Sequence, residues 1–284
     1  MTASRCQLLP SVWPSVWLLL LVSGAQGCER NPPDQASVTK PATTAASKPV
    51  RSGYDYQSAQ TQALQDDDFA NPGTLWLDQG AVLWQQAPDD NIKSCADCHD
   101  QPAQASAASM RGTALRYPAL DPNSGALIDL AGRINRCRTE QQQQPPWPLE
   151  SEPLLALTTL VTAASHGMTV NREITPELQP FFDAGRDYFY GRRGQLNLAC
   201  HQCHEQQAGQ MLRGDRLSEG HSNGYPAYRL QWQSIGSLQR RLRFCNVGVR
   251  AEPFAYGAPE YLNLELFLQW RGKGLRIETP AVRR

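Results

Sequence analysis

The sequence predicts a mostly α-helical protein in which two small helical domains follow one another. Two C-x-x-C-H motifs, at residues 95–99 and 200–204, stand in equivalent places in the 284-residue chain. Fifteen residues before the first cysteine of each motif stands a glycine, with an aromatic residue four positions after it. Each motif is followed by a stretch with helical apolar spacing, at residues 154–164 and 260–270. Such an internal repeat predicts two domains of one fold.

Each C-x-x-C-H motif is typical of covalent haem attachment. The two thiols of a motif react with the two vinyl groups of one porphyrin, and the adjacent histidine binds the iron from one side. The sequence therefore predicts two covalently bound c-type haems. The attachment residues and proximal iron ligands are Cys95, Cys98 and His99 in the first motif and Cys200, Cys203 and His204 in the second. A redox dithiol or a zinc site would not explain the histidine that follows each motif.

The two glycines, Gly80 and Gly185, lie on the same helix face as their aromatic partners, Trp84 and Phe189. A glycine in this place lets a second helix cross closely over the first. The spacing resembles the N-terminal helix of class I c-type cytochromes, and the later apolar stretches would be the crossing C-terminal helices. We therefore expect tandem class I cytochrome c-like domains at residues 55–170 for the first haem and 171–284 for the second.

The N-terminus has the features of an export signal. Arg5 precedes an apolar stretch at residues 12–22, so residues 1–27 are predicted to be a signal peptide that directs the protein to the periplasm. Cys28 stands where lipoprotein processing would leave a lipid-anchored cysteine. The sequence does not distinguish a lipidated Cys28 from an unmodified one. Residues 28–54 are rich in Pro, Ala, Thr, Ser and Lys, which predicts a disordered linker. The formal net charge is zero, so no basic surface points to nucleic acid as a partner.

The sixth iron ligand is predicted to be a cysteine in both halves. Class I cytochromes usually place a methionine between the haem motif and the last helix, but the methionines here fall at unmatched positions. Cys137 lies 38 residues after His99, and Cys245 lies 41 residues after His204. A thiolate at each iron would lower the reduction potential below that of a His/Met site. A disulfide between Cys137 and Cys245 is the alternative.

Five segments outside the haem motifs carry a more specific resemblance. They are residues 134–138 (INRCR), 220–226 (GHSNGYP), 240–245 (RRLRFC), 249–253 (VRAEP) and 278–283 (ETPAVR). From about Asp78 onward the chain resembles the SoxA family, the catalytic subunits of the SoxAX cytochromes of bacterial thiosulfate oxidation. Because both haem motifs are intact, it resembles the two-haem form of that family.

The resemblance implies an L-cysteine S-thiosulfotransferase. Members conjugate thiosulfate to a cysteine of the carrier SoxYZ, form a heterodimer with the cytochrome SoxX, and pass electrons to a downstream cytochrome. Cys245 is carried over as an iron ligand and as the active-site sulfur, present as a persulfide, whereas Cys137 is carried over only as a ligand. The family's substrate-binding arginine corresponds to Arg241, and a guanidinium suits the oxygens of a sulfonate.

Two other functions fit the haem motifs alone. A two-haem periplasmic electron-transfer cytochrome without substrate chemistry would need neither an arginine nor a modified sulfur beside its iron. A two-haem peroxidase would need an open or displaceable ligand, which thiolates at both irons argue against. His166 and His221 could be taken for iron ligands, but we expect hydrogen-bonding roles for both.

Overall fold

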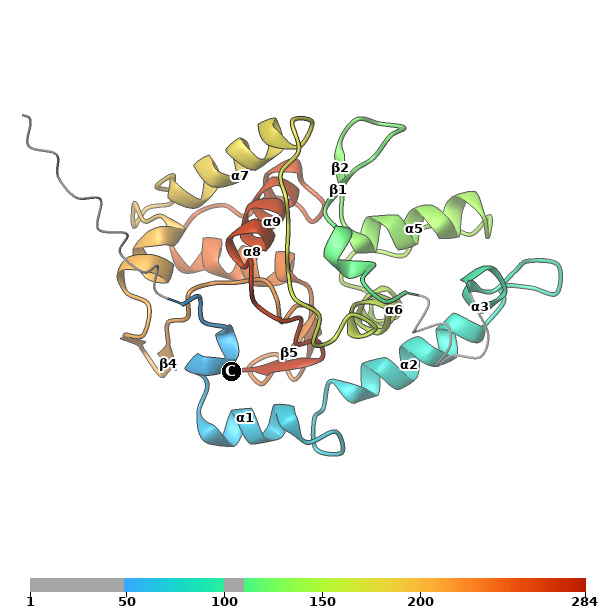
Figure 1. The fold of residues 1–284 in the computed structure, drawn as a ribbon, viewed down its shortest axis with the longest axis horizontal. Coiled ribbons are helices and arrows are strands. Elements are labelled where there is room, and N and C mark those ends of the chain that lie inside the picture. The colour runs from blue at the N-terminus through green and yellow to red at the C-terminus, as the bar shows by residue number, and fades with distance from the viewer. Residues whose placement is uncertain (1–48, 100–109) are drawn as a thin grey trace, which may run out of the picture. The chain divides into compact units, whose positions relative to one another are not determined.

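The structure is a computed structural model that describes residues 49–99 and 110–284. The predicted signal peptide and Cys28 lie outside the described residues. From residue 48 onward the chain forms one compact unit, and helices make up most of its regular structure, as predicted (Figure 1). Within the described ranges, no helix is long and apolar enough to cross a membrane.

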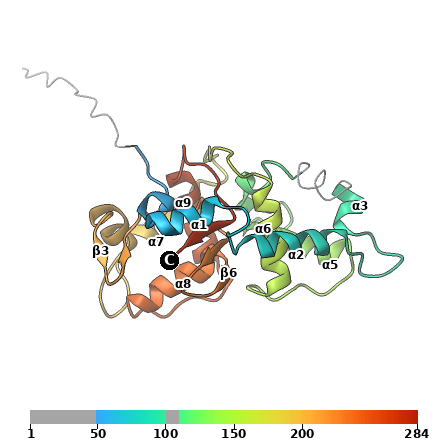
Figure 2. The same ribbon diagram turned by 90° about the horizontal axis from the view of Figure 1, so that it is seen from below.

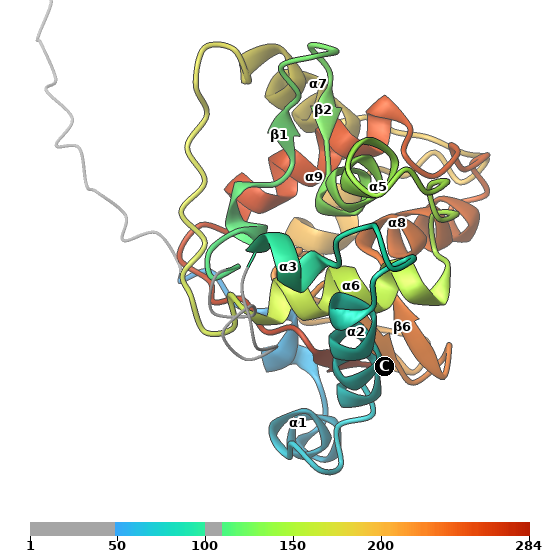
Figure 3. The same ribbon diagram turned by 90° about the vertical axis from the view of Figure 1, so that its right-hand side faces the viewer.

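Two pairs of crossing helices frame this unit. Helix α2 (Thr74–Gln85) packs against α6 (Glu152–Ala163), and α7 (Gln179–Tyr190) packs against α9 (Pro259–Arg271). Figures 1 and 2 show the first pair to the right of the second, and Figure 3 looks onto α2 and α6. Helices α6 and α9 are the predicted C-terminal helices, and each has a proline in its first turn, where no intrahelical N–H partner is lost.

Each pair crosses at the glycine that the sequence singled out. A Cβ atom added to Gly80 would lie 2.6 Å from the carbonyl oxygen of Ala156, in α6. One added to Gly185 would press still more closely on the carbonyl oxygen of Asn263, in α9. Any side chain would therefore force the helices apart. The prediction that these glycines permit close helix crossing is confirmed.

The aromatic residues that follow the glycines lie in two separate apolar cores. Trp84 is buried with Leu157 and Val161 of α6. Phe189 belongs to a larger core, which includes Phe182, Leu262, Leu264, Phe267 and Leu268. Leu127 also enters this second core, from the hairpin of β1 (Ala119–Leu120) and β2 (Leu127–Ile128). A residue of the first half of the chain thus helps to cover the helices of the second half.

Two further helices, not predicted from the sequence, lie between the haem motifs and the last helices. Helix α5 (Leu130–Glu140) begins after Asp129, whose carboxylate accepts a hydrogen bond from the Gly132 N–H at 2.7 Å. Helix α8 (Leu238–Gly248) begins after Ser237, whose hydroxyl accepts one from the Arg240 N–H at 3.1 Å. Each cap satisfies an N–H group that has no partner within its helix and fixes where the helix starts.

A small sheet completes the fold. Its strand order is β6 (Ser234–Gly236), β5 (Ala227–Arg229) and β7 (Ala281–Arg283), with β5 antiparallel to β6 and parallel to β7. Helix α1 (Ala59–Asp66) contacts β7 and follows a short 3₁₀ turn, η1 (Gly53–Tyr56). The remaining short elements are η2 (Ala114–Arg116), β3 (Met211–Leu212) and β4 (Asp215–Arg216). Residues 51–56, at the end of the predicted linker, are thus held against the C-terminal part of the chain.

Replacing Gly185 with alanine should destabilise the protein, because the new methyl group would meet a backbone carbonyl of α9 that cannot rotate away. We expect the free energy of unfolding to fall by roughly 1–3 kcal/mol, measured by denaturant unfolding of the haem-loaded protein. Gly248→Ala, at the end of α8, is the matched control, because no atom lies within 4 Å of the added Cβ. Equal stability of the two variants would contradict a close crossing at Gly185.

Candidate functional site

The second haem motif and Cys245 come together at one place. Cys245 is the eighth residue of α8, and its thiol lies close enough to His204, in the π-helical turn η3 (Gln202–Gln206), for the imidazole to lower its pKa. Burial raises the pKa of both Cys200 and Cys203, and negative charge at Cys245 raises each further, so both attachment cysteines lie near it. The four predicted residues of the second haem therefore surround one site.

Positive charge gathers around the Cys245 thiol. Burial alone would raise its pKa, but the guanidinium of Arg241, the imidazole of His204 and the charge of Arg229 together lower it to about 7. In turn, the charge of Cys245 raises the pKa of Arg241. Burial acts in the opposite direction but is the smaller effect. A thiol with this pKa is about half ionised at neutral pH, and the thiolate is the form that binds iron and attacks electrophiles.

Arg241 stands one helical turn before Cys245, on the same face of α8. Its guanidinium carbon lies 5.3 Å from the centre of the Phe244 ring. In the described part of the chain, no side-chain carboxylate forms an ion pair with Arg241. The Asp215 carboxylate also raises the pKa of Arg241, but it is not paired with it directly, and a half-buried guanidinium beside a thiol of lowered pKa is suited to bind an anionic substrate.

The imidazole of His204 is held by the loop that follows β4. Its Nδ1 lies 2.8 Å from the carbonyl oxygen of Ser218, which leaves the other ring nitrogen as the one available to a haem iron. Gly220 lies against the ring: its φ is +73°, and an added Cβ would lie 2.7 Å from Cγ of His204. Only glycine combines this backbone conformation with such a close approach.

Arg271, the last residue of α9, ties this loop to the motif. Its Nε lies 3.2 Å from the Glu205 carboxylate, and its Nη2 donates to the carbonyl oxygen of His204 at 3.4 Å. Its Nη1 donates to the carbonyl oxygen of Glu219. From the sequence, Arg271 could either border the second haem or only cap the last helix, and nothing in the spacing of Ser218 from the motif marks its contact with His204. The GHSNGYP segment was the one signal in this region.

The first motif forms a similar but less enclosed arrangement. Its helix α3 (Cys95–His99) lies beside α2, and the Trp84 and His99 rings are 5.6 Å apart between centroids. Cys137 is the eighth residue of α5, the position that Cys245 has in α8. Negative charge at Cys137 raises the pKa of Cys95, and negative charge at Cys98 raises the pKa of Cys137, so the three thiols lie near one another. Residues 100–109, which follow the motif, lie outside the described residues.

The electrostatics of the two sites differ. Arg133 stands four residues before Cys137, as Arg241 does before Cys245, but Arg133 is exposed. Burial raises the pKa of Cys137, and Arg133 does not offset this. Cys137 therefore lacks the activation that lowers the pKa of Cys245. This difference agrees with a plain ligand at the first site and a reactive sulfur at the second.

Cys137 and Cys245 are both free thiols, so the alternative disulfide between them is not formed. Each instead lies with its own haem motif. At the second site the structure offers two thiols for the porphyrin vinyl groups, and an imidazole and a thiol that lie near each other as candidate iron ligands. This donor set fits a c-type haem.

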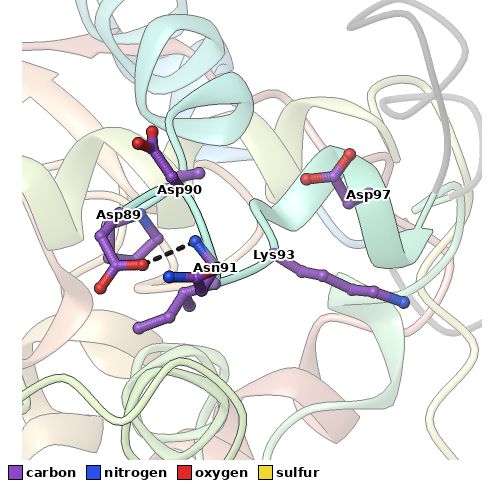
Figure 4. Close-up of a pocket in the computed structure, with 8 residues that line it drawn as sticks. Asp89, Asp90, Asn91, Lys93 and Asp97 are labelled. Atoms are coloured by element: carbon purple, nitrogen blue, oxygen red, sulfur yellow. Dashed lines mark hydrogen bonds between the residues drawn. The ribbon is translucent and has the colours of Figure 1, made fainter.

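A surface hollow of about 480 Å³ lies beside the first motif (Figure 4). It is lined by residues 87–93 and Asp97. Asp89 accepts a hydrogen bond from the Asn91 N–H at 2.7 Å, drawn as a dashed line. Three aspartates and a single lysine line the hollow, so its charge is unfavourable for an anionic substrate. The arginines at Cys245 provide the opposite environment.

His166 and His221 have the hydrogen-bonding roles that we expected. Nδ1 of His166 lies 3.1 Å from the carbonyl oxygen of Thr279. His221 is buried, with Nε2 at 3.2 Å from the Glu219 carboxylate, and burial together with the charge of Arg271 lowers its pKa to about 4. His221 therefore helps to fix the loop that carries Gly220.

Comparisons with known proteins agree with this arrangement. Residues 79–170 match the family model of the SoxA/TsdA cytochrome c domain. The chain is 38% identical over 233 residues to the L-cysteine S-thiosulfotransferase subunit SoxA of Pseudaminobacter salicylatoxidans, covering 82% of this chain and 80% of the relative. It is 36% identical to the L-cysteine S-thiosulfotransferase subunit SoxA of Paracoccus pantotrophus, and the match covers 82% of this chain and 79% of the relative. The crystal structure of SoxXA from P. pantotrophus contains a chain that matches with a TM-score of 0.78 and 35% identity, covering 83% of this chain and 87% of that one.

Replacing Gly220 with alanine should change the second haem, because the methyl group would press on the ring of its proximal histidine. We expect altered ligand-field absorption and electron paramagnetic resonance signals for that haem alone. Gly209→Ala is the matched control: its φ of +91° imposes a similar backbone strain, but no atom lies within 4 Å of the added Cβ. The same spectral change in both variants would show that contact with His204 is not the cause.

Proposed function

This chain belongs to the SoxA family of L-cysteine S-thiosulfotransferase subunits, and we propose that it conjugates thiosulfate oxidatively to a carrier cysteine. In this reaction an S–S bond forms between the sulfane sulfur of thiosulfate and the sulfur of the carrier cysteine. The thiosulfate dianion and the carrier thiol give a cysteine S-thiosulfonate anion, one proton and two electrons. The observation that carries the proposal is a thiol with a pKa of about 7, Cys245, near a predicted proximal histidine and an arginine that forms no ion pair with a side-chain carboxylate of the described residues.

Each residue of the site has a defined task in this proposal. Arg241 binds the sulfonate oxygens, which directs the sulfane sulfur of thiosulfate toward Cys245. Cys245 is both an iron ligand and the sulfur at which thiosulfate reacts, as a persulfide in the form known for the family. His204 is the second ligand to the same iron. A haem at this motif would accept the two electrons one at a time and pass each on to a further cytochrome.

We extend the proposal to two haems in tandem cytochrome c-like domains. Support comes from the parallel construction of the two halves, each with a crossing helix pair, a C-x-x-C-H turn and a capped helix with a cysteine at its eighth position. Because only Cys245 has a lowered pKa, we assign substrate chemistry to the second haem and electron transfer to the first.

The proposed partners follow from the reaction and from the family. The matched crystal structure is of a SoxXA complex, which supports a SoxX-type cytochrome as the partner subunit. SoxYZ would be the carrier whose cysteine is modified, and a further cytochrome would accept the electrons. We propose the periplasm as the location, on the basis of the export signal at residues 1–27, with Cys28 as a possible lipid anchor.

Alanine variants of Cys245 and Arg241 should fail in different ways. Cys245→Ala removes the iron ligand and the reactive sulfur, so thiosulfate turnover with SoxYZ should vanish and the spectrum of the second haem should change. Arg241→Ala should leave that spectrum nearly intact. Its loss of one charge-assisted hydrogen bond, roughly 1.5 to 3 kcal/mol, should lower kcat/KM for thiosulfate about ten- to hundredfold.

Arg133→Ala is the matched control, since Arg133 has the same place relative to Cys137. It should leave kcat/KM within about twofold of the wild type. If Arg241→Ala has normal thiosulfate kinetics, the anion-binding site does not lie at Arg241 of α8. A wild-type protein whose haems are not reduced by thiosulfate and carrier would favour the electron-transfer cytochrome instead.

Replacing Cys137 with methionine should raise the reduction potential of the first haem, because a neutral thioether stabilises ferric iron less than a thiolate does. We expect a rise on the order of 100 mV in a spectroelectrochemical titration, with the haem still covalently attached. Thiosulfate turnover should persist at a substantial level. An unchanged potential would show that Cys137 is not a ligand of the first haem. Complete loss of turnover would contradict the proposed division of tasks between the haems.

A further inference from the structure

Arg229 is a buried arginine on the central strand of the small sheet. It is the last residue of β5, and only 6% of its surface is exposed. Its neighbour Tyr228 packs into the apolar cluster with Leu155, Ile235 and Val282. Because successive side chains of a strand point to opposite faces, Arg229 points away from that cluster. Burying a guanidinium is unfavourable unless its charge is compensated, so a buried Arg229 calls for a compensating partner.

The side-chain partners of Arg229 do not provide that compensation. Nη2 donates to the backbone oxygen of Arg284, and Nη1 donates to the hydroxyl of Tyr225 at 3.4 Å. The Nε group is buried and has no hydrogen-bond partner. Among the described residues, no side-chain carboxylate forms an ion pair with Arg229.

Arg283 shows what a conventional buried arginine looks like in this sheet. It lies directly opposite Arg229 on β7 and is equally exposed, at 6%. Unlike Arg229, it forms an ion pair with the carboxylate of Glu278. Burial and strand position are therefore matched, and the acidic partner is the difference.

Arg229 lies beside the helix that carries the active-site residues. Its guanidinium carbon is 5.3 Å from the centre of the Trp232 ring, and that of Arg240, the neighbour of Arg241 in α8, is 4.4 Å from the same ring. Arg240 also donates to Ser234, which pairs with Arg229 across β5 and β6. The positive charge of Arg241 disfavours the charged form of Arg229, whereas negative charge at Cys245 favours it, so both residues lie near Arg229.

Two guanidinium groups therefore lie near each other beside Cys245, and among the described residues neither forms an ion pair with a side-chain carboxylate. Such a cluster is more positive than it can balance by itself, and an incoming anion relieves the repulsion between the arginines. We infer that Arg229 is a second substrate-binding residue, which holds the sulfonate group of thiosulfate together with Arg241. The inference rests on the proposed function for the identity of the anion. It adds a residue from the sheet to a site otherwise built on α8 and the haem motif.

The test is an equilibrium titration that needs no turnover. Thiosulfate is added to the haem-loaded complex without carrier, and its dissociation constant is read from the spectral change of the second haem. Arg229→Gln, which removes the charge and keeps a shorter polar side chain, should weaken binding at least tenfold, while the absorption of the thiosulfate-free haem stays as in the wild type. Arg229→Lys should recover part of the loss. In turnover assays the KM for thiosulfate should rise more than kcat falls.

Arg283→Gln is the control, because it removes an equally buried charge from the neighbouring strand. It should lower the unfolding temperature and leave the thiosulfate dissociation constant within twofold of the wild type. If Arg229→Gln does not fold, Arg229→Met carries the same test with an apolar chain of similar length. Wild-type thiosulfate binding by either folded variant, or equal weakening by Arg283→Gln, would overturn the inference. A wild-type protein that binds thiosulfate but does not transfer it to SoxYZ would overturn the proposed function and leave the role of Arg229 standing.

Discussion

The placement of Cys245 beside His204 is the constraint on which the rest of the site depends. It joins α8 to the second haem motif, two segments about 40 residues apart in the chain. The Ser237 cap fixes the start of α8 and hence the turn on which Cys245 stands. At the other side, Arg271 at the end of α9 holds the backbone around His204. The close crossing of α7 and α9 at Gly185 in turn fixes α9.

The two halves of the chain use one construction for two chemical purposes. In both, a capped helix carries a cysteine at its eighth position and an arginine one turn earlier. What differs is the environment of the arginine: Arg133 is exposed to solvent, which screens its charge, whereas Arg241 is shielded and acts strongly on its cysteine. The pKa of Cys137 is consequently raised and that of Cys245 lowered. Depth of burial, rather than residue type, separates the cysteine that we propose as a plain ligand from the one that we propose as reactive.

The N-terminal segment of the compact unit also contributes to the second site. The Glu219 carboxylate accepts hydrogen bonds from the Arg51 N–H and the Tyr56 hydroxyl, each at 3.0 Å. Burial would raise the pKa of Glu219, but these hydrogen bonds and the contact with His221 lower it. Glu219 is therefore a carboxylate that ties residues 51–56 to the loop supporting His204. Residues 51–56 thereby stabilise a site whose other parts lie about 150 residues later.

The features that depend on local spacing could be predicted from the residues alone. The C-x-x-C-H motifs define haem chemistry because the two thiols and the imidazole must fit one porphyrin, and the Gly-x-x-x-aromatic spacing defines a helix face that another helix can cross. The equivalent places of Cys137 and Cys245 in the repeat, and the resemblance around Cys245, indicated which residues belong together. Tertiary structure alone decided the electrostatics. Whether Arg133 or Arg241 is shielded, and whether Arg229 meets α8 across Trp232, depends on how distant segments pack, and one-dimensional spacing does not encode burial or the dielectric environment that follows from it.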